Sequence, residues 1–542
     1  MASPVPIREL GKFGIIKDVA PFDLPVNAWS DGSNVLFLEN RVTSGPILRD
    51  VTNVASVAAL TEPVVFTTTL ETATGFDPVI FATRDFRFSR YLSDSLVDVS
   101  PVAAGGVSDA SYTSATLGGV TYINRADFAP HYYNGLSNRV DPLPNWNANW
   151  RCQALRSFKD FLLAFNVTKS GVGYPTMVKW SNATQAGQIP ADWDEANLAS
   201  LAGENVISEA SSALVDGGPL KNDFVAYSSR EAFLIEFIGA PLVFSFRRLF
   251  SDAGMVAKNC FVEVDGKHFV FGVDDLYVHD GISKKSIANG RVKRTVFREL
   301  NQRKADRCFV FESKALSCIF FCYPSAISEF AFPNTDYCNR AAVYNYLLDC
   351  WSFVDLPNVS SANEANLDPV LIYSTASSGY DRIGGTFAEL DDGYIRHSIL
   401  TSIGRSQSNV DSHRVLGLDH PGDTKIPKPS VPALMPKSQL SRSGLSLEQL
   451  GFALDSRKLV TTLYPLVQSV DQDDSVLISF GRHDNPDQTA STEAVIAFNP
   501  TTDHKVNTRN TGRFIAMGVE FPNTGGYYLS GYDVEVRRLS VR

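Results

Sequence analysis

The apolar and polar positions of the chain follow the pattern of short β-strands. Short apolar runs, many of them containing an aromatic residue, end at polar turns rich in Asp and Gly. Helices need apolar positions repeated every three to four residues over a longer stretch, and that periodicity is rare here. The pattern therefore predicts an all-β protein.

Between residues 56 and 356 the pattern recurs in about six units. Their starts are spaced by roughly 40 to 60 residues, the range of four-stranded propeller blades with loop insertions. A single four-stranded sheet cannot cover both of its faces, and radial packing of blades would cover them. The sequence thus predicts a β-propeller of about six blades, although stacked β-sandwiches would give the same alternation. The units are 63–91, 119–128, 158–180, 224–246, 260–279 and 308–354.

Outside these units the chain changes character. Residues 401–445 are rich in Ser, Pro, Gly and Asp, which predicts an extended insertion that projects as a tip or contact loop. Ser446 to Gln449 forms a potential capping box for a short helix, and Asp192 to Leu201 is a second helix candidate. β-character returns from Leu459, and this C-terminal β-sheet region is expected to pair with the N-terminal hairpin. The predicted parts are an N-terminal arm and hairpin (1–55), a propeller (56–400), the insertion (401–458) and a C-terminal β region (459–542).

Composition and charge narrow the class of protein. The 542 residues include 35 Phe, 19 Tyr, 37 Gly and 28 Pro, which suits sheets joined by frequent turns. The formal net charge of −10 argues against ordinary nucleic-acid binding, which depends on clustered Lys and Arg. No signal-peptide layout begins the chain, and no apolar run approaches the ~20 residues that span a bilayer. These features predict a protein synthesised in a cytoplasm.

No residue pattern in the sequence identifies a catalytic, cofactor or metal site. The seven cysteines are expected to be buried free thiols, including Cys318 and Cys322 within one apolar run. His268 and His279 are expected to be half-exposed structural residues of strands. Gly171-Val172-Gly173-Tyr174 lacks the context of a dinucleotide loop, and no Gly-x-Ser-x-Gly elbow occurs.

Acidic and aromatic residues leave one enzymatic alternative open. Carboxylate pairs occur at Asp274-Asp275, at Asp391-Asp392 and among Asp471, Asp473 and Asp474, and turn capping explains them most simply. A glycosidase would need two such groups about 5–10 Å apart. The six tryptophans are expected to pack blades and turns, although they could stack on sugars. The tryptophans are Trp29, Trp146, Trp150, Trp180, Trp193 and Trp351.

The N-terminal 45 or so residues form the most distinctive stretch of the sequence. A polar turn that contains Asn27, Ser30, Asp31, Gly32 and Asn34 precedes an apparent hairpin at 35–42. Together with three other segments, this stretch resembles the tail nozzle proteins of short-tailed bacteriophages, also called tail-hub or DNA-stabilisation proteins. Leu36 and Leu38 stand where that family usually has a basic residue. The segments that carry the resemblance are 10–15, 18–35, 161–193, 512–516 and 529–534.

The resemblance implies a structural virion protein and no enzyme. Such a protein forms a homohexameric tube on the adaptor proteins of the portal, with tail fibres or spikes as further partners, and it retains DNA and guides its ejection. Six copies would carry a formal charge of 6 × −10 = −60, and an acidic lumen would let the duplex slide without binding. No cofactor and no stable membrane insertion are implied. The alternative is a propeller at the host surface that binds or cleaves glycan; a cellular propeller scaffold is a third, weaker hypothesis.

Overall fold

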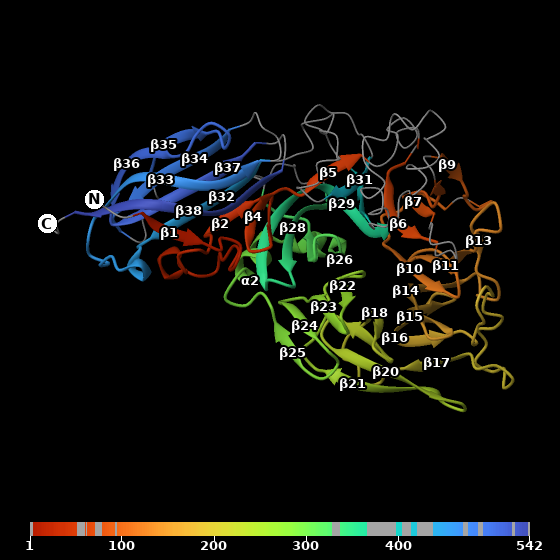
Figure 1. Cartoon of the computed structure of the whole chain (residues 1–542). Helices are drawn as coiled ribbons and strands as arrows, with labels where there is room; N and C mark the ends of the chain where they lie inside the picture. The colour runs from red at the N-terminus through yellow and green to blue at the C-terminus, as the bar shows by residue number, and fades with distance from the viewer. Residues whose placement is uncertain are drawn as a thin grey trace.

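Antiparallel strands make up nearly all of the regular structure in the computed structural model (Figure 1). The predicted all-β class is therefore confirmed, with many small antiparallel sheets. The residues that the structure describes are 4–50, 60, 62–70, 78–92, 95–103, 105–327, 336–365, 397–403, 414–419, 437–469, 475–485, 491–522 and 526–539.

Six sheets follow one another in chain order, one for each of the six predicted units. The first five are four-stranded meanders, in which every strand pairs with the next. The first sheet contains β6 (Val64–Thr69), β7 (Val79–Thr83), β8 (Phe88–Leu92) and β9 (Ser95–Asp98). The second contains β10 (Tyr112–Leu117), β11 (Val120–Arg125), β12 (His131–Tyr133) and β13 (Asp141–Pro142).

The next three sheets repeat this arrangement. The third contains β14 (Trp150–Phe158), β15 (Phe161–Lys169), β16 (Val172–Trp180) and β17 (Gly203–Val206). The fourth contains β18 (Leu214–Leu220), β19 (Asp223–Ser228), β20 (Ala232–Gly239) and β21 (Val243–Phe250). The fifth contains β22 (Phe261–Val264), β23 (Lys267–Phe271), β24 (Leu276–His279) and β25 (Lys284–Ser286).

The sixth sheet is larger, because strands from outside the predicted 56–400 range complete it. Its order is β26-β27-β28-β29-β30-β31-β5, so that an N-terminal strand forms its edge. Its strands are β26 (Phe309–Ser313), β27 (Cys318–Tyr323), β28 (Cys338–Asn345), β29 (Cys350–Ala365), β30 (His397–Ser402), β31 (Arg414–Asp419) and β5 (Ile47–Asp50).

Each of these sheets packs against the next, and the sixth packs against the first. The first strands of successive sheets lie side by side, as β10 does with β14 and β14 with β18. β29 and β30 of the sixth sheet contact β6 of the first, so the order of packing returns to its start. Figure 1 shows the sheets arranged around a common centre. Apolar side chains fill the spaces between neighbouring sheets and remove both faces of each from water.

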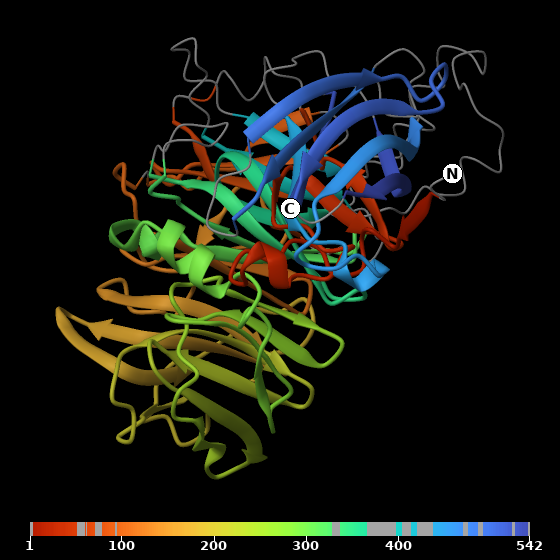
Figure 2. The ribbon, with the colours of Figure 1, turned by 90° about the vertical axis from the view of Figure 1, so that its left-hand side faces the viewer.

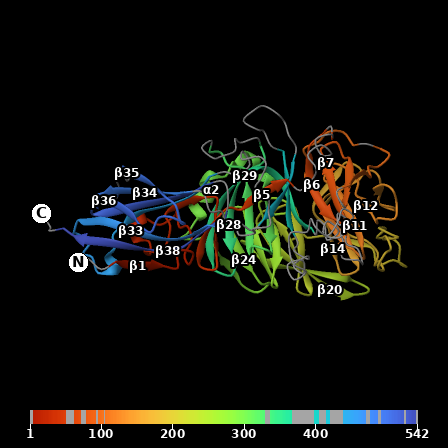
Figure 3. The same cartoon turned by 45° about the horizontal axis from the view of Figure 1, so that its top comes forward.

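The two ends of the chain build a separate pair of sheets. One has the order β3-β4-β38-β33-β36, with β1 beside β38, and the other has the order β2-β32-β37-β34-β35. Figures 2 and 3 show this pair at one end of the molecule, beside the six sheets. The strands are β1 (Val5–Arg8), β2 (Asp31–Ser33), β3 (Val35–Leu38), β4 (Arg41–Ser44), β32 (Ser438–Leu445), β33 (Lys458–Ser469), β34 (Val476–His483), β35 (Ser491–Phe498), β36 (Val506–Gly512), β37 (Phe514–Phe521) and β38 (Tyr527–Arg538).

The predicted N-terminal hairpin and its pairing with the C-terminal block are both present. Val35 pairs with Ser44 within the hairpin, and Tyr528 and Leu529 of β38 pair with β4. The expected extended insertion does not hold for two parts of 401–458, because β31 and β32 are strands there. Both find partners far away in sequence, β5 and β2 respectively, which the local pattern cannot reveal. Residues 404–413 and 420–436 lie outside the described residues.

The helix predicted at 192–201 is wrong, and the one predicted from Ser446 is confirmed only as a short 3₁₀ helix. Residues 192–201 form a series of turns in which the Asp192, Asp194 and Asn197 side chains each accept a hydrogen bond from the backbone N–H two residues later. Such local bonds compete with helix formation. At 446–449 only the short 3₁₀ helix η7 (Glu448–Leu450) forms, and Gly451 ends it at a φ of 87°. The α-helix among the described residues, α2 (Lys293–Glu299), was not predicted.

Burial of the cysteines is confirmed, whereas the expected exposure of two histidines is wrong. All seven cysteines are buried free thiols. His268 and His279, expected to be half-exposed, are 0% and 1% exposed. The two rings flank the hydroxyl of Tyr227 between the fourth and fifth sheets. Hydrogen bonds to this hydroxyl satisfy ring nitrogens of both histidines, so the side chains can be buried instead of half-exposed.

The thiols should be unreactive while the protein is folded. Burial raises the pKa of Cys152 and of Cys350 to about 12, so almost no reactive thiolate exists at neutral pH. We expect a thiol reagent such as dithionitrobenzoate to label none of the seven cysteines in the native protein and all of them in guanidinium chloride. Rapid labelling of the native protein would contradict this expectation.

Candidate functional site

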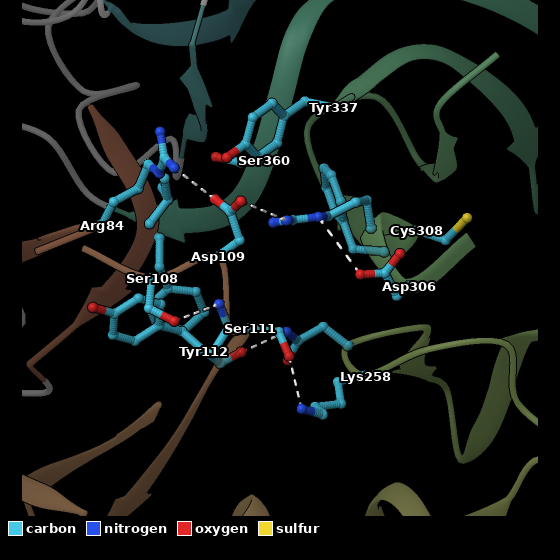
Figure 4. A pocket seen from close by; sticks show the side chains of 16 residues that line it. Arg84, Ser108, Asp109, Ser111, Tyr112, Lys258, Asp306, Cys308, Tyr337 and Ser360 are labelled. Atoms are coloured by element: carbon cyan, nitrogen blue, oxygen red, sulfur yellow. Dashed lines mark hydrogen bonds and ion pairs between the residues drawn. The ribbon is translucent and has the colours of Figure 1, made fainter. Parts of the chain in front are cut away.

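A concave polar feature lies where the six sheets meet. A narrow cavity of about 50 Å³ adjoins a wider one of about 490 Å³. Both are lined by Asp109, Ala110, Ser111, Lys258 and Asp306. These residues precede the first strands of the second, fifth and sixth sheets, and Figure 4 shows their side chains converging. The central cavity therefore draws its polar groups from turns far apart in sequence.

Two arginines hold Asp109 at the entrance of the central cavity. Arg84 Nη2 lies 3.0 Å from Asp109 Oδ1, and Arg307 Nη2 lies 3.7 Å from Asp109 Oδ2. Arg307 is also 3.6 Å from Asp306. Because Asp109 is 56% exposed, these pairs are screened by solvent and each contributes about 0–1 kcal/mol.

Lys258 is a partly buried cation of the central cavity. Its Nζ donates to Ser111 Oγ at 2.7 Å and to Gln153 Oε1 at 2.9 Å. Burial lowers the pKa of Lys258, and the nearby charge of Asp216 acts in the opposite direction. An ammonium group bound by neutral oxygens in this way joins the second, third and fifth sheets.

Deeper between the sheets, Arg156 and Asp216 form a bidentate ion pair. The two hydrogen bonds measure 2.8 and 2.5 Å, and Asp216 is fully buried. Asn259 completes the arrangement, since its N–H donates to Asp216 at 2.8 Å and its Oδ1 accepts from Arg156 at 2.7 Å. Buried charges need such complete pairing, because one left alone costs several kcal/mol.

Arginine–aspartate ion pairs recur in and beside the central cavity. Each of the carboxylates of Asp109, Asp127 and Asp216 faces an arginine. Among the described residues, no group of three or more His, Cys, Asp or Glu side chains is placed to hold a metal ion.

The carboxylate pairs considered in the sequence do not meet in the central cavity. Asp274 and Asp275 lie in the turn between β23 and β24, where Asp275 Oδ1 accepts a hydrogen bond from Ser286 Oγ. The partner is a side-chain hydroxyl and not a backbone N–H, so turn capping stays a prediction. Asp391, Asp392, Asp471, Asp473 and Asp474 lie outside the described residues.

The tryptophans are mostly packed inside the protein. Trp29, Trp193 and Trp351 are fully buried, and Trp146 and Trp180 are each 7% exposed. Trp150 is half-buried, with the Lys169 ammonium 4.7 Å from its ring centre. Packing of sheets and turns, as expected, leaves little tryptophan surface for stacking on a sugar.

The sequence did not identify the residues of the central cavity. Asp109, Lys258 and Asp306 stand in three separate connections without any spacing motif. The available signal is positional and covers two of them, since Lys258 and Asp306 each stand two residues before a predicted unit, 260–279 and 308–354. Asp109 precedes β10, a strand that the predicted unit 119–128 does not include.

The N-terminal segment that resembles the nozzle family lies between the sixth sheet and the terminal sheet pair. The N–H of Ile15 donates to the carbonyl of Trp351 at 2.8 Å, and Trp29 Nε1 donates to the carbonyl of Leu10 at 3.0 Å. Gly14 has a φ of +64°, and a Cβ there would lie 2.6 Å from the Trp351 carbonyl oxygen. Only glycine fits this close approach.

Acidic and amide side chains of the same segment continue the junction. Asp18 accepts hydrogen bonds from the N–H groups of Arg294 and Thr295, so it caps α2 from outside the helix. Asn34 Nδ2 donates to Asp355 Oδ2 at 3.0 Å, and the Asp355 N–H donates back to Asn34 Oδ1 at 2.8 Å. The segment thus joins the two parts of the molecule.

Apolar side chains of β3 also contact both parts. Val35 and Phe37 belong to the apolar cluster that includes the terminal sheets, while Leu36 packs with the sixth sheet. All three are buried. Leu36 therefore lies in a strand that is covered on both faces.

Comparison with known proteins leaves the family open. No family model and no curated protein matches the chain. Among solved structures, a computationally designed protein called Ika8 aligns at 9% sequence identity, covering 69% of this chain and 100% of its own, with a TM-score of 0.36. So low a TM-score establishes no common fold, and no argument below depends on it.

Proposed function

We propose that this chain is a structural virion protein, the nozzle of a short-tailed bacteriophage tail. The observation that carries the proposal is the position of the segment resembling that family. Its distinctive residues lie at the junction between the sixth sheet and the terminal sheets, at Gly14, Asp18, Trp29 and Asn34. These residues fix two parts of one chain to each other, as we would expect in a rigid subunit of a tube.

We further propose that the six sheets form a β-propeller. Support comes from the packing of the sixth sheet on the first and from the placement of first strands next to one another. The side chains at the centre are engaged in ion pairs between sheets, which would rigidify such a propeller. The terminal sheet pair would then be the part available to mount on the adaptor.

The proposed assembly is a homohexamer through which DNA passes. A net charge of −10 for each copy would make the conduit repel phosphate at short range, so the duplex could slide. Retention of DNA would rest on a mechanical gate rather than on affinity. Adaptor proteins, and fibres or spikes, would be the protein partners, and the tail of the virion the location.

Imaging tests the assembly directly. We expect negative-stain electron microscopy of the purified protein mixed with the portal–adaptor assembly of its particle to show a six-fold extension of the adaptor. The portal–adaptor assembly alone is the control. A chain that stays monomeric and never docks would overturn the proposal. Release of reducing sugar from a host glycan would then favour the alternative, a propeller that cleaves glycan at the host surface.

A further inference from the structure

The strand β35 (Ser491–Phe498) forms an open edge of the terminal sheet pair. It ends the sheet order β2-β32-β37-β34-β35 and pairs with β34 alone. At the opposite borders of the two sheets, β2 and β3 contact β29 of the sixth sheet, so β35 lies away from the six sheets (Figure 1). No backbone hydrogen bond joins the other side of β35 to any residue that the structure describes. Alternate N–H and C=O groups of this strand are therefore directed outward.

Other outer edges of the molecule carry features that block further pairing. Natural proteins protect an edge strand by making it short or by placing proline, lysine or arginine in it. The outermost strands of the first and third sheets, β9 and β17, are four residues long. β35 differs, because it has eight residues and its last five, 494–498, contain neither a charge nor a proline. The remaining protected edges are β13 with Pro142, β21 with Arg247 and Arg248, β25 with Lys284 and Lys285, and β36 with Arg509.

The side chains of β35 also favour the addition of a strand. Val495, on the outer face of the sheet, is 60% exposed. On the inner face Phe498 is buried, and Ile496 packs against the apolar core of the terminal sheets while remaining partly exposed. A strand added beside β35 would cover the open side of this core and pair the free backbone groups. Another extended backbone fits them, because its donors and acceptors repeat at the same spacing.

We propose that β35 pairs with β35 of a second copy of this chain, antiparallel and about a two-fold axis. The sequence is self-complementary in the register that places Val495 opposite Val495. Ala494 then lies opposite Ile496, and both positions belong to the inner face. The one charged residue of β35, Glu493, falls opposite Ala497 and not opposite its own copy. A single contact thus satisfies the free edges of both copies and joins their sheets into one.

Backbone pairing, and not charge, selects this partner. Charged residues of both signs flank β35, among them Arg482, Asp503 and Lys505. A second copy brings the same unpaired strand, whereas folded proteins of other kinds seldom leave one free. The inference does not depend on the proposed nozzle function. Neighbouring copies in a six-fold ring meet through unlike surfaces, and this contact joins like surfaces, so the pair would belong to the free chain before it is mounted.

Disulfide trapping tests the contact and its register. Val495→Cys places a thiol opposite its own copy, where the Cα atoms of an antiparallel pair are about 4.5–5.5 Å apart, a distance that a disulfide spans. The control is Leu477→Cys on β34, which is also exposed (36%) on the outer face but lies one strand away from the edge. With diamide as the oxidant, we expect Val495→Cys to form a covalent dimer at least about ten-fold faster than the control. The natural protein should form none, because its seven cysteines are buried.

Sedimentation velocity measures the association without a cross-link. We expect the natural protein to show a monomer–dimer equilibrium that shifts with concentration. Val495→Lys sets like charges opposite each other and should weaken dimerisation at least about ten-fold, whereas Leu477→Lys should leave it unchanged. Circular dichroism establishes that each variant is folded. Should Val495→Lys not fold, the trapping rate of Val495→Cys decides, because that substitution changes the side chain little in size.

Several outcomes would overturn the proposal. These are a natural protein that sediments as a monomer at every concentration, equal trapping rates for Val495→Cys and Leu477→Cys, and full dimerisation of Val495→Lys. Binding of a synthetic peptide with the β34 sequence 476–482 to a monomeric protein would also overturn it, and would assign the edge to a strand of another protein. Failure to form a six-fold ring on the adaptor would leave these results unchanged, so the two proposals can fail separately.

Discussion

Replacing Asp355 with Ala is expected to destabilise the protein by about 3–5 kcal/mol, because it leaves a buried guanidinium without its main partner. Arg340 is 1% exposed, and its Nη1 donates to Asp355 Oδ1 and to Ser33 Oγ. A second carboxylate, that of Glu299, lies 4.0 Å from Nε. The variant should therefore unfold at a clearly lower guanidinium concentration, measured by tryptophan fluorescence.

Two further variants separate the charge effect from simple loss of packing. Lys12→Ala removes the exposed ion pair with Glu9 and should cost no more than about 1 kcal/mol. The double variant Arg340→Met with Asp355→Leu removes both charges and should be more stable than Asp355→Ala alone. A double variant as unstable as the single one would show that loss of the ion pair between Arg340 and Asp355 is not the cause.

The same variant should loosen the junction between the two parts of the molecule. Asp355 Oδ2 accepts from Asn34, and Asn34 also donates to the carbonyl of Lys437 at 3.0 Å. One carboxylate therefore connects the sixth sheet to the N-terminal segment and, through it, to β32. These contacts account for the polar residue Asn34 in the distinctive N-terminal segment. Asn34 is buried, and its side chain is polar because it bonds to Asp355 and Lys437.

The sequence predicted the sheets well because their strands are local features. Phe233 to Phe237 or Cys318 to Cys322 can be recognised without knowledge of their partners, since apolar side chains must be covered on both faces of a packed sheet. Positive-φ residues at the hairpin turns, such as Lys159 and Asp265, agree with the polar turns seen in the sequence.

The sequence predicted poorly what depends on distant partners. β32 looked like part of a loop because its two neighbours, β2 and β37, come from opposite ends of the chain. Asp18 caps a helix that begins more than two hundred residues later, so neither the cap nor α2 showed a local signal. The central cavity is hidden for the same reason, since its charged residues come from separate connections.

The histidine pair between the fourth and fifth sheets misled sequence analysis in a different way. Their alternating strand positions indicated half-exposed side chains. The sequence did not show that the buried hydroxyl of Tyr227 lies between the two rings. His279 Nδ1 accepts from the N–H of Gly281, so its Nε2 carries hydrogen and donates to Tyr227 Oη. The tyrosine hydroxyl in turn donates to His268 Nδ1 at 2.7 Å, and His268 Nε2 donates to the carbonyl of Pro219 at 2.7 Å. This chain of bonds is complete only when both imidazoles are neutral.

Stability should therefore fall as the pH is lowered from about 6.5 to about 4. Burial lowers the pKa of His268 to about 4, and burial together with the neighbouring His268 lowers that of His279 to about 3. In the unfolded chain both titrate near 6.5. Below that pH the unfolded state binds more protons than the native state, so the free energy of unfolding decreases by roughly 3 kcal/mol per histidine by pH 4. The buried His131, whose pKa burial also lowers, acts in the same direction.

Urea unfolding curves recorded at pH 7.5 and at pH 5 measure this effect. The natural protein should lose a large part of its stability between these two values, whereas His268→Gln with His279→Gln should start lower and change much less. His504→Gln is the matched control, since His504 is exposed and its loss should leave the pH dependence unchanged. A double variant that keeps the full decrease between pH 7.5 and 5 would assign the acid sensitivity to other groups. The difference in slope isolates the histidines because carboxylates with lowered pKa, such as Glu195 at about 2, affect stability chiefly at lower pH.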